Sequence, residues 1–368
     1  MGLRSRQYLL PVHRWLGLTA GLLVLLVAIT GAGMAFRTEL EAVVAPELLI
    51  VPACSMRLPL DTLVDNAHAA YPNAGRLTLV RAFGANNAST RIALSDNHWI
   101  YLDPCRGNVL GRQEKYGGLF GTLGYLHGFR FFDQHDIVAG SIALFFALLL
   151  LLGSAVWLPA TWRAFRFVSK INPRLRGRAR LLNLHQCLGL YASPILLISA
   201  LTGAPQVLDW LAQGLRHMAG DPAMIKPVVI DRPANAKFAP LEASLQEAQR
   251  RVPQYRKLQL RYPKNDHVPI VMELVGQDAP HMQALSVLEM NPYSAKVIRF
   301  TPYAQSHLGQ RLYQWMLAVH YGWVGGLFGQ LLLFLAALCV PVLAWTGLRS
   351  YLLRICGDKK TVHKKAGA

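Results

Sequence analysis

The sequence lacks the short motifs that mark soluble cofactor-binding enzymes. It contains no GxxxxGK(S/T) phosphate loop, no HExxH zinc motif and no GxSxG nucleophile elbow. No GxGxxG follows a predicted strand, so no nicotinamide or flavin domain is indicated. The absence of CxxC and CxxCH argues against a structural zinc site and against covalently attached haem.

Charged residues are also scarce, and acidic residues most of all. Asp and Glu number 20 against 38 Lys and Arg, and charged residues make up 16% of the chain, whereas hydrophobic residues make up 53%. The apolar residues cluster in four runs of about 20 residues, the length that a helix needs to cross a bilayer. The runs are Leu16–Phe36, Ile137–Leu158, Leu188–Leu208 and Leu327–Leu348. Because backbone polar groups cannot stay unpaired in lipid, we predict an α-helical membrane protein with four transmembrane helices.

The net charge of +18 is concentrated in three segments that flank the apolar runs. These segments are the N-terminus, residues 159–184 and the C-terminal tail. Lys and Arg near span ends mark the cytoplasmic side of a membrane. We therefore predict that both termini and the basic loop are cytoplasmic and that residues 37–136 and 209–326 lie outside. Topology explains the positive charge, so no nucleic-acid partner is expected.

The chain repeats itself. A histidine near the start of the first span is followed by a glycine four residues later and a Thr-Gly pair seventeen residues later, and the third span has the same spacing. The matched residues are His13, Gly17 and Thr30-Gly31 in the first half and His185, Gly189 and Thr202-Gly203 in the second. This internal copy favours a span over a cleaved signal peptide for the first run, which also exceeds the usual apolar core of about 7–15 residues.

Each outside segment is predicted to form a small α+β module, with one helix on a short antiparallel sheet. The helices begin at Pro59-Leu60-Asp61 and at Pro240-Leu241-Glu242. The expected strands are Leu77–Val80, Arg91–Leu94 and Trp99–Leu102, then Leu258–Arg261, Ile270–Leu274 and Ala284–Glu289. Asp103-Pro104 and Asn291-Pro292 begin the turns that follow.

Four of the twelve histidines occupy matched positions in the two halves. His13 and His185 open the spans that leave the cytoplasm, and His127 and His320 precede the spans that return to it. Two histidine pairs at two depths are what two haems with axial imidazole ligands require. Histidines at a membrane edge can instead be structural, and His135 is an alternative ligand to His127 that has no counterpart in the second half.

Other residues have two interpretations each. Arg14, Arg130 and Arg311 could pair with haem propionates, although ordinary anchoring at the membrane edge is the simpler explanation. Cys54 and Cys105 share the first outside segment and could form a disulfide if that compartment is oxidising; otherwise they are two unpaired thiols.

These features resemble the PepSY-associated transmembrane family, and within it the bacterial ferrisiderophore reductases of the FoxB type. The resemblance rests on the opening His13–Gly17, its copy at His185–Gly189, the Thr-Gly pairs and the PepSY-like modules. It implies an inner-membrane protein with two haem b groups that reduces ferric siderophores on the periplasmic side. Gln186-Cys187 replaces Arg14-Trp15 in the second copy, so a shared role of Arg14 in both halves is not expected.

The resulting layout has eight parts. They are 1–36 (cytoplasmic N-terminus and first span), 37–116 (first PepSY-like module), 117–159 (histidine segment and second span), 160–184 (basic loop), 185–210 (third span), 211–306 (second module), 307–350 (histidine segment and fourth span) and 351–368 (basic tail). The expected partners are the lipid bilayer, a ferric siderophore and an electron donor that is either a quinol or a cytoplasmic reductase.

Two alternatives remain at this point. The protein could be a non-enzymatic sensor or regulator that uses its PepSY-like modules to bind a peptide or a partner. It could also be a cytochrome b subunit that passes electrons to a partner protein.

Overall fold

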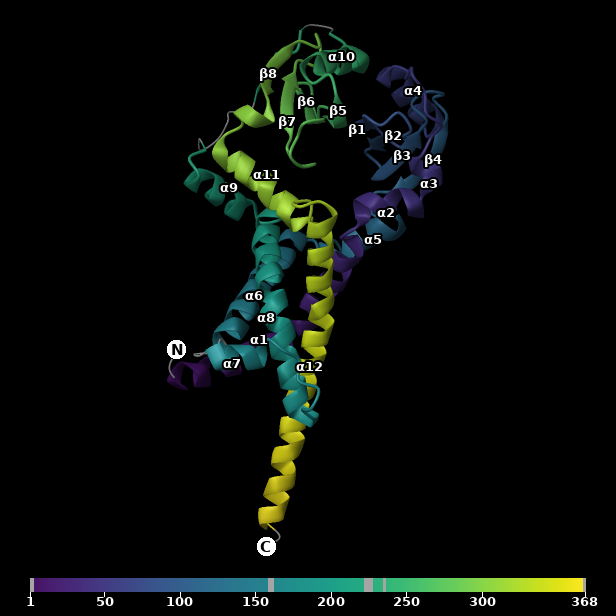
Figure 1. Cartoon of the computed structure of the whole chain (residues 1–368). Helices are drawn as coiled ribbons and strands as arrows, with labels where there is room; N and C mark the ends of the chain where they lie inside the picture. The colour runs from purple at the N-terminus through teal and green to yellow at the C-terminus, as the bar shows by residue number, and fades with distance from the viewer. Residues whose placement is uncertain (1–2, 158–161, 222–227, 234–235, 367–368) are drawn as a thin grey trace. The chain divides into compact units, whose positions relative to one another are not determined.

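The computed structural model describes residues 3–157, 162–221, 228–233 and 236–366, and the chain divides into two compact units (Figure 1). The membrane unit contains Met1–Ala35, Leu123–Ala212 and Val319–Ala368. The sheet unit contains Phe36–Thr122 and Gln213–Ala318. Leu158, at the end of the second predicted span, lies outside the described residues.

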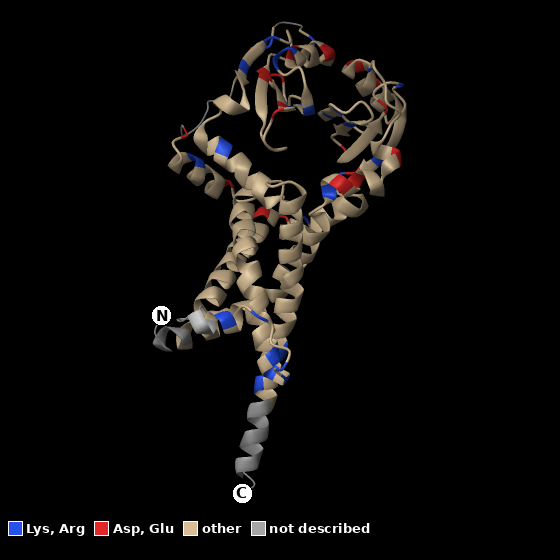
Figure 2. Ribbon diagram, viewed as in Figure 1, with Lys and Arg blue, Asp and Glu red and all other residues tan. Residues whose placement is uncertain are grey.

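Four long helices form the membrane unit. They are α1 (Leu3–Met34), α6 (His135–Trp157), α8 (Gly177–Gly203) and α12 (Leu327–Ala366). Each contains a stretch that is long and apolar enough to cross a membrane, as the sequence predicts. Large apolar side chains such as Leu22 and Phe328 are 76% and 72% exposed on the bundle, as expected of residues that face lipid. Figure 2 shows that the middle of the bundle is nearly free of charge, with Lys and Arg near one end and acidic residues near the other.

The helices pack as a ring in which α1 and α8 each contact both α6 and α12. Small residues lie at these contacts, including Ala28, Ala192 and Ala336. In lipid there is little hydrophobic drive to bring helices together, so close approach of backbones over small side chains stabilises the bundle. The shorter helices α7 (Trp162–Val168) and η1 (Ala204–Gln206) also belong to this unit.

Three further helices run along the chain from one unit into the other. They are α5 (Gly118–His127), α9 (Asp209–Met218) and α11 (Leu308–His320). His127 and His320 are the last residues of α5 and α11, and both belong to the membrane unit.

The sheet unit is built on one antiparallel sheet of eight strands in the order β4-β3-β2-β1-β5-β6-β7-β8. The strands are β1 (Leu77–Phe83), β2 (Thr90–Leu94), β3 (His98–Leu102), β4 (Val109–Glu114), β5 (Tyr255–Arg261), β6 (Ile270–Gly276), β7 (Ser286–Met290) and β8 (Val297–Thr301). The short helices α2 (Arg37–Val44), α3 (Pro46–Leu49) and η2 (Tyr303–Gln305) complete the unit.

Two helices cover one face of this sheet, α4 (Leu60–Ala70) from the first module and α10 (Leu241–Arg251) from the second. Alternate strand residues point toward them, as the period-2 pattern requires. Leu63 on α4, Ile92 on β2 and Met272 on β6 are at most 1% exposed in a core shared by both modules.

The expected helix and three strands are present in each module, but each module has a fourth strand, and the two sheets are one. β1 pairs with β5 from Leu79↔Arg261 to Phe83↔Lys257. Both strands would otherwise be sheet edges with unpaired backbone groups, which can pair with another chain and cause aggregation. Their pairing with each other prevents this. Only the far edges, β4 and β8, remain unpaired within the described sheet.

The two modules also cap each other's helices. The Asp61 carboxylate of α4 accepts hydrogen bonds from the backbone N–H groups of Leu241 (2.8 Å) and Glu242 (2.9 Å) at the start of α10. The Glu242 carboxylate in turn accepts the N–H of Leu60 (3.0 Å) at the start of α4. Each carboxylate satisfies helix-terminal donors that lack partners within their own helix.

Candidate functional site

The first histidine pair joins α1 to α8 in the membrane unit. The ring centroids of His13 and His185 are 6.4 Å apart. The Nδ1 atom of His13 lies 3.1 Å from the Leu149 carbonyl of α6, and Nδ1 of His185 lies 3.1 Å from the Leu343 carbonyl of α12. Because a carbonyl can only accept, each Nδ1 carries the proton and donates it.

The second pair has the same construction at the ends of α5 and α11. The ring centroids of His127 and His320 are 6.3 Å apart. Nδ1 of His127 donates to the Val27 carbonyl of α1 at 3.0 Å, and Nδ1 of His320 donates to the Ser199 carbonyl of α8 at 2.9 Å. The contacts of the second half thus match those of the first, one backbone carbonyl for each ring.

This hydrogen bonding fixes the tautomer of all four rings. With the proton on Nδ1, the lone pair is on Nε2, the form in which imidazole binds a metal. Among the described residues, none of the four Nε2 atoms has a hydrogen-bond partner. Each pair therefore presents two unprotonated nitrogens without a protein partner.

Each imidazole also lies against a glycine of a neighbouring helix. A Cβ built on Gly203 would lie 2.6 Å from Cε1 of His320, and one on Gly153 would lie 2.8 Å from Cε1 of His13. The corresponding distances are 3.2 Å from Gly31 to His127 and 3.4 Å from Gly347 to His185. A Cβ at Gly203 or Gly153 would displace the ring or the helix, one at Gly31 would be tight, and one at Gly347 would make ordinary contact.

The separation of the rings in each pair suits two imidazoles that would hold one haem between them. Two imidazoles bound to one metal ion at about 2 Å each place their ring centroids about 6 Å apart. Among the described residues, no group of three or more His, Cys, Asp or Glu side chains could hold a metal ion. Two protein ligands alone hold a bare ion poorly, whereas a porphyrin supplies the other ligands itself.

The two pairs lie at different depths of the bundle. Thr30, whose Oγ1 is 3.1 Å from Nδ1 of His127, is seventeen residues beyond His13 on α1. At a rise of about 1.5 Å per residue, the pairs are separated by roughly 25 Å along the helix. This is most of the ~30 Å thickness of a bilayer core.

The other candidates do not join either histidine pair through a described contact. Arg14 lies over the ring of Tyr351, 5.7 Å from its centroid. Arg130 lies within 3.0 Å of both ring nitrogens of His135, which also pairs with Asp136 at 2.8 Å. His135 is thus part of a small polar cluster at the start of α6 and lies in no histidine pair.

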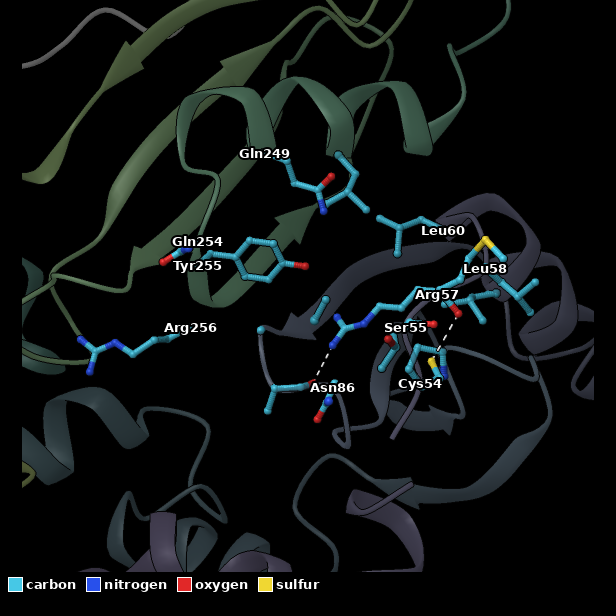
Figure 3. A pocket seen from close by; sticks show the side chains of 18 of the residues that line it. Cys54, Ser55, Arg57, Leu58, Leu60, Asn86, Gln249, Gln254, Tyr255 and Arg256 are labelled. Carbon is cyan, nitrogen blue, oxygen red and sulfur yellow. Dashed lines mark hydrogen bonds between the residues drawn. The ribbon is translucent and has the colours of Figure 1, made fainter. Parts of the chain in front are cut away.

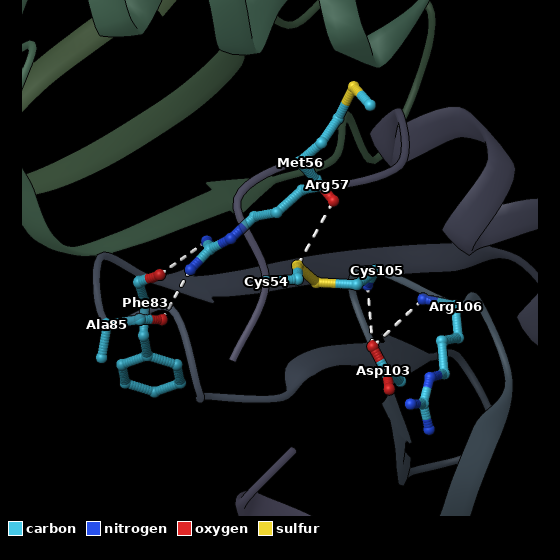
Figure 4. The surroundings of a disulfide bond; sticks show 8 residues. All are labelled: Cys54, Met56, Arg57, Phe83, Ala85, Asp103, Cys105 and Arg106. Carbon is cyan, nitrogen blue, oxygen red and sulfur yellow. Dashed lines mark hydrogen bonds between the residues drawn. A yellow bond between two sulfur atoms is a disulfide. The ribbon is translucent and has the colours of Figure 1, made fainter. Parts of the chain in front are cut away.

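Arg311 lies on α11, nine residues before His320, and its buried Nε has no hydrogen-bond partner among the described residues. In the sheet unit, Cys54 and Cys105 form a disulfide with a Cα–Cα distance of 6.4 Å (Figure 4). The other cysteines, Cys187, Cys339 and Cys356, are free.

A groove of about 970 Å³ lies in the sheet unit between the two modules (Figure 3). Its walls are mixed, with apolar residues such as Leu60 and Leu245 beside the polar Arg57, Glu242 and Arg256. The charged groups are already used: Arg57 donates to the Phe83 and Ala85 carbonyls, Arg256 donates to the Gly276 and Ala279 carbonyls, and Glu242 caps α4.

A four-helix membrane bundle with a PepSY-like sheet unit defines the class of this protein. The sequence matches the family described as PepSY-associated TM region over residues 10–354, and the chain belongs to that family. No curated protein matches the chain.

The glycines and carbonyls around the histidines are the site residues that sequence reasoning missed. The Thr30-Gly31 and Thr202-Gly203 pairs are part of the sequence repeat, but the sequence alone gives no reason for them. Thr346-Gly347 and Gly153, on the spans that end each half, were the signal that could have completed the pattern.

Proposed function

We propose that the protein holds two haem b groups and transfers electrons across the bacterial inner membrane to ferric iron bound by a siderophore in the periplasm. The observation that carries the proposal is the duplicated histidine pair, with ring centroids 6.4 and 6.3 Å apart and all four Nδ1 atoms bonded to carbonyls. A structural role of the histidines does not require this matched spacing, or a free Nε2 on every ring.

His13 and His185 would hold one haem near the cytoplasmic face, and His127 and His320 would hold the other near the periplasmic face. When bound, haem supplies one-electron oxidation and reduction at its iron. The protein orients the four imidazoles through their hydrogen bonds to backbone carbonyls. The apolar helices around them keep water away from the ligating nitrogens. Because the sequence contains no motif for a nicotinamide or flavin, the electron donor is a quinol or a separate cytoplasmic reductase.

The positive-inside rule supports the orientation that this activity needs. Arg174, Arg176, Arg178 and Arg180 lie between α7 and α8 or at the start of α8, and Arg349 and Arg354 lie toward the end of α12. The sheet unit is then periplasmic, and it is the part of the chain with a groove large enough for a chelated metal ion.

The visible spectrum of the purified protein tests the proposal. We expect a Soret band and about two haems per chain in the pyridine haemochrome assay. His13→Ala and His127→Ala should each remove one haem, and His135→Ala should remove none. A colourless wild-type protein, or equal loss in all three variants, would contradict the haem sites.

The acceptor is tested separately. Dithionite-reduced protein, mixed anaerobically with a ferric siderophore in a stopped-flow instrument, should reoxidise as the chelate accepts one electron per iron. A haem-loaded protein that stays reduced with ferric chelates but is reoxidised by a partner protein would instead favour a cytochrome b subunit. A haem-free protein that binds peptides would favour a sensor.

A further inference from the structure

The face of the sheet opposite α4 and α10 carries an excess of positive charge at the junction of the two modules. Arg81 on β1 and Arg91 on β2 are directly paired in register. Lys257 and Arg261 are four residues apart on β5, which pairs with β1. Their side chains therefore lie on the same face of the sheet. Arg37 on α2 joins them through Glu41. The carboxylates that interact with these five cations are Glu41 and Glu273. Glu289, further along the same face, pairs with Arg299 at 2.9 Å.

The two carboxylates do not neutralise the centre of this cationic face. Glu41 pairs with Arg37 at 3.0 Å and with Arg91 at 3.3 Å. Glu273 pairs with Arg261 at 3.1 Å, at the exposed rim. Arg81 has only the neutral Gln259 as acceptor, at 2.7 and 3.1 Å. Among the described residues, the side chain of Lys257 makes no hydrogen bond or ion pair, although the charge of Glu273 acts on it.

The central cations are held in a partly buried, aromatic setting. The guanidinium of Arg81 lies 4.9 Å from the Trp99 ring centroid, and that of Arg91 lies 5.0 Å from Phe83 and 5.7 Å from Tyr101. Nε of Arg91 is buried without a partner among the described residues. A buried donor left unpaired is unfavourable, so this arrangement is explained if a ligand supplies the acceptor.

The lowered pKa values of two cations in this cluster agree with this interpretation. Burial, followed by the neighbouring charges of Arg91 and Arg37, lowers the pKa of Arg81 to about 10. Burial and the nearby guanidinium of Arg81 lower the pKa of Lys257 to about 8. Like charges are thus held close together in a partly desolvated place, which is the usual preparation for an anionic ligand.

We propose that this cationic face, centred on Arg81, Arg91 and Lys257, binds the anionic oxygen atoms of a carboxylate-bearing metal chelate. Combined with the proposed function, on which this step rests, the siderophore substrate is an anionic ferric complex. Guanidinium groups match carboxylates in geometry, and the aromatic rings provide an apolar wall for the chelate backbone. In the groove of Figure 3, by contrast, Arg57 and Arg256 already use N–H donors on backbone carbonyls, and the carboxylate of Glu242 also lines the groove.

Binding is measured without any redox step by calorimetry on the full-length protein in detergent, with gallium(III) citrate as a redox-inert probe. We expect Arg81→Gln and Lys257→Met to weaken binding at least about tenfold, the loss typical of one charge-assisted hydrogen bond. Arg250→Gln is the matched control, because Arg250 is on the exposed face of α10 with its side chain 74% exposed. Its affinity should equal that of the wild type.

Three outcomes would overturn the inference. They are no binding by the wild type, equal binding by all variants, and tighter binding of a cationic gallium tris-hydroxamate than of gallium citrate. If citrate alone binds as tightly as its gallium complex, the anion site stands and the metal-chelate substrate is wrong. Lys257→Met removes a partly buried charge and should fold, as circular dichroism will verify. If the purified protein contains no haem but binds gallium citrate, the proposed function is wrong and the anion-binding site stands.

Discussion

Replacing Gly203 with alanine should damage the His127–His320 pair specifically. The new Cβ would lie 2.6 Å from Cε1 and 2.9 Å from Nδ1 of His320, where ordinary contact begins near 3.4 Å. The ring must therefore move by nearly 1 Å, or α8 must shift, at a cost of about 1–3 kcal/mol for overpacking. Such a shift also strains the hydrogen bond from Nδ1 of His320 to the Ser199 carbonyl.

The four glycines predict a graded series. The loss of haem should be greatest for Gly203→Ala, then Gly153→Ala at 2.8 Å and Gly31→Ala at 3.2 Å, and it should be least for Gly347→Ala at 3.4 Å. Gly21→Ala on α1 is the control, because a Cβ there meets nothing within 4 Å.

The assay is the ratio of haem to protein, together with a redox titration of the remaining haem. Gly203→Ala should lower the ratio from about two toward one, or shift the potential of one haem, and should leave the other as in the wild type. Gly203→Ala and Gly21→Ala proteins with the same haem content and the same titration would refute the argument that the glycine positions the ligand.

Three further predictions concern other parts of the chain. Asp61→Ala removes the acceptor for the first N–H groups of α10 and should destabilise the sheet unit by about 1 kcal/mol, seen as a lower thermal midpoint than in the wild type. Lys257 has a pKa of about 8 in the folded state against an ordinary 10.5, so between these pH values the unfolded state binds the extra proton and the free energy of unfolding should rise with pH. In urea unfolding, this rise should be smaller for Lys257→Met than for the wild type. Thr30→Val should shift the potential of the haem proposed at His127 and His320, because Thr30 contacts Nδ1 of His127. Thr202→Val should not, because among the described residues the Thr202 hydroxyl donates to the Ile198 and Ser199 carbonyls and contacts neither ring.

The membrane helices and the matched placement of four histidines in the two halves were predictable from sequence, because both follow from spacing along one chain. An apolar run of about 20 residues has few alternatives to a membrane helix. The recurrence of His13 at His185 pointed to paired positions. The pairing itself depends on which helices are neighbours, and no local pattern encodes that.

Other features depend on contacts between distant residues. That β1 and β5 would pair, from Leu79 with Arg261 onward, could not be read from either strand alone. The glycine beside each imidazole is a single residue in an apolar helix, where glycine has many other uses. Likewise, the contact between Arg130 and His135 joins two residues that the sequence suggested for separate roles, and neither role indicates that they are neighbours.

The joined sheet has a consequence for how the protein is made. β1 is synthesised early, yet its partner β5 begins only at Tyr255, after α6 and α8 have been made. Until then, the first module has an exposed strand edge, and its helix α4 lacks the carboxylate of Glu242. Completion of the sheet unit therefore waits until α6 and α8 have been synthesised, because β5 and Glu242 follow both helices in the chain.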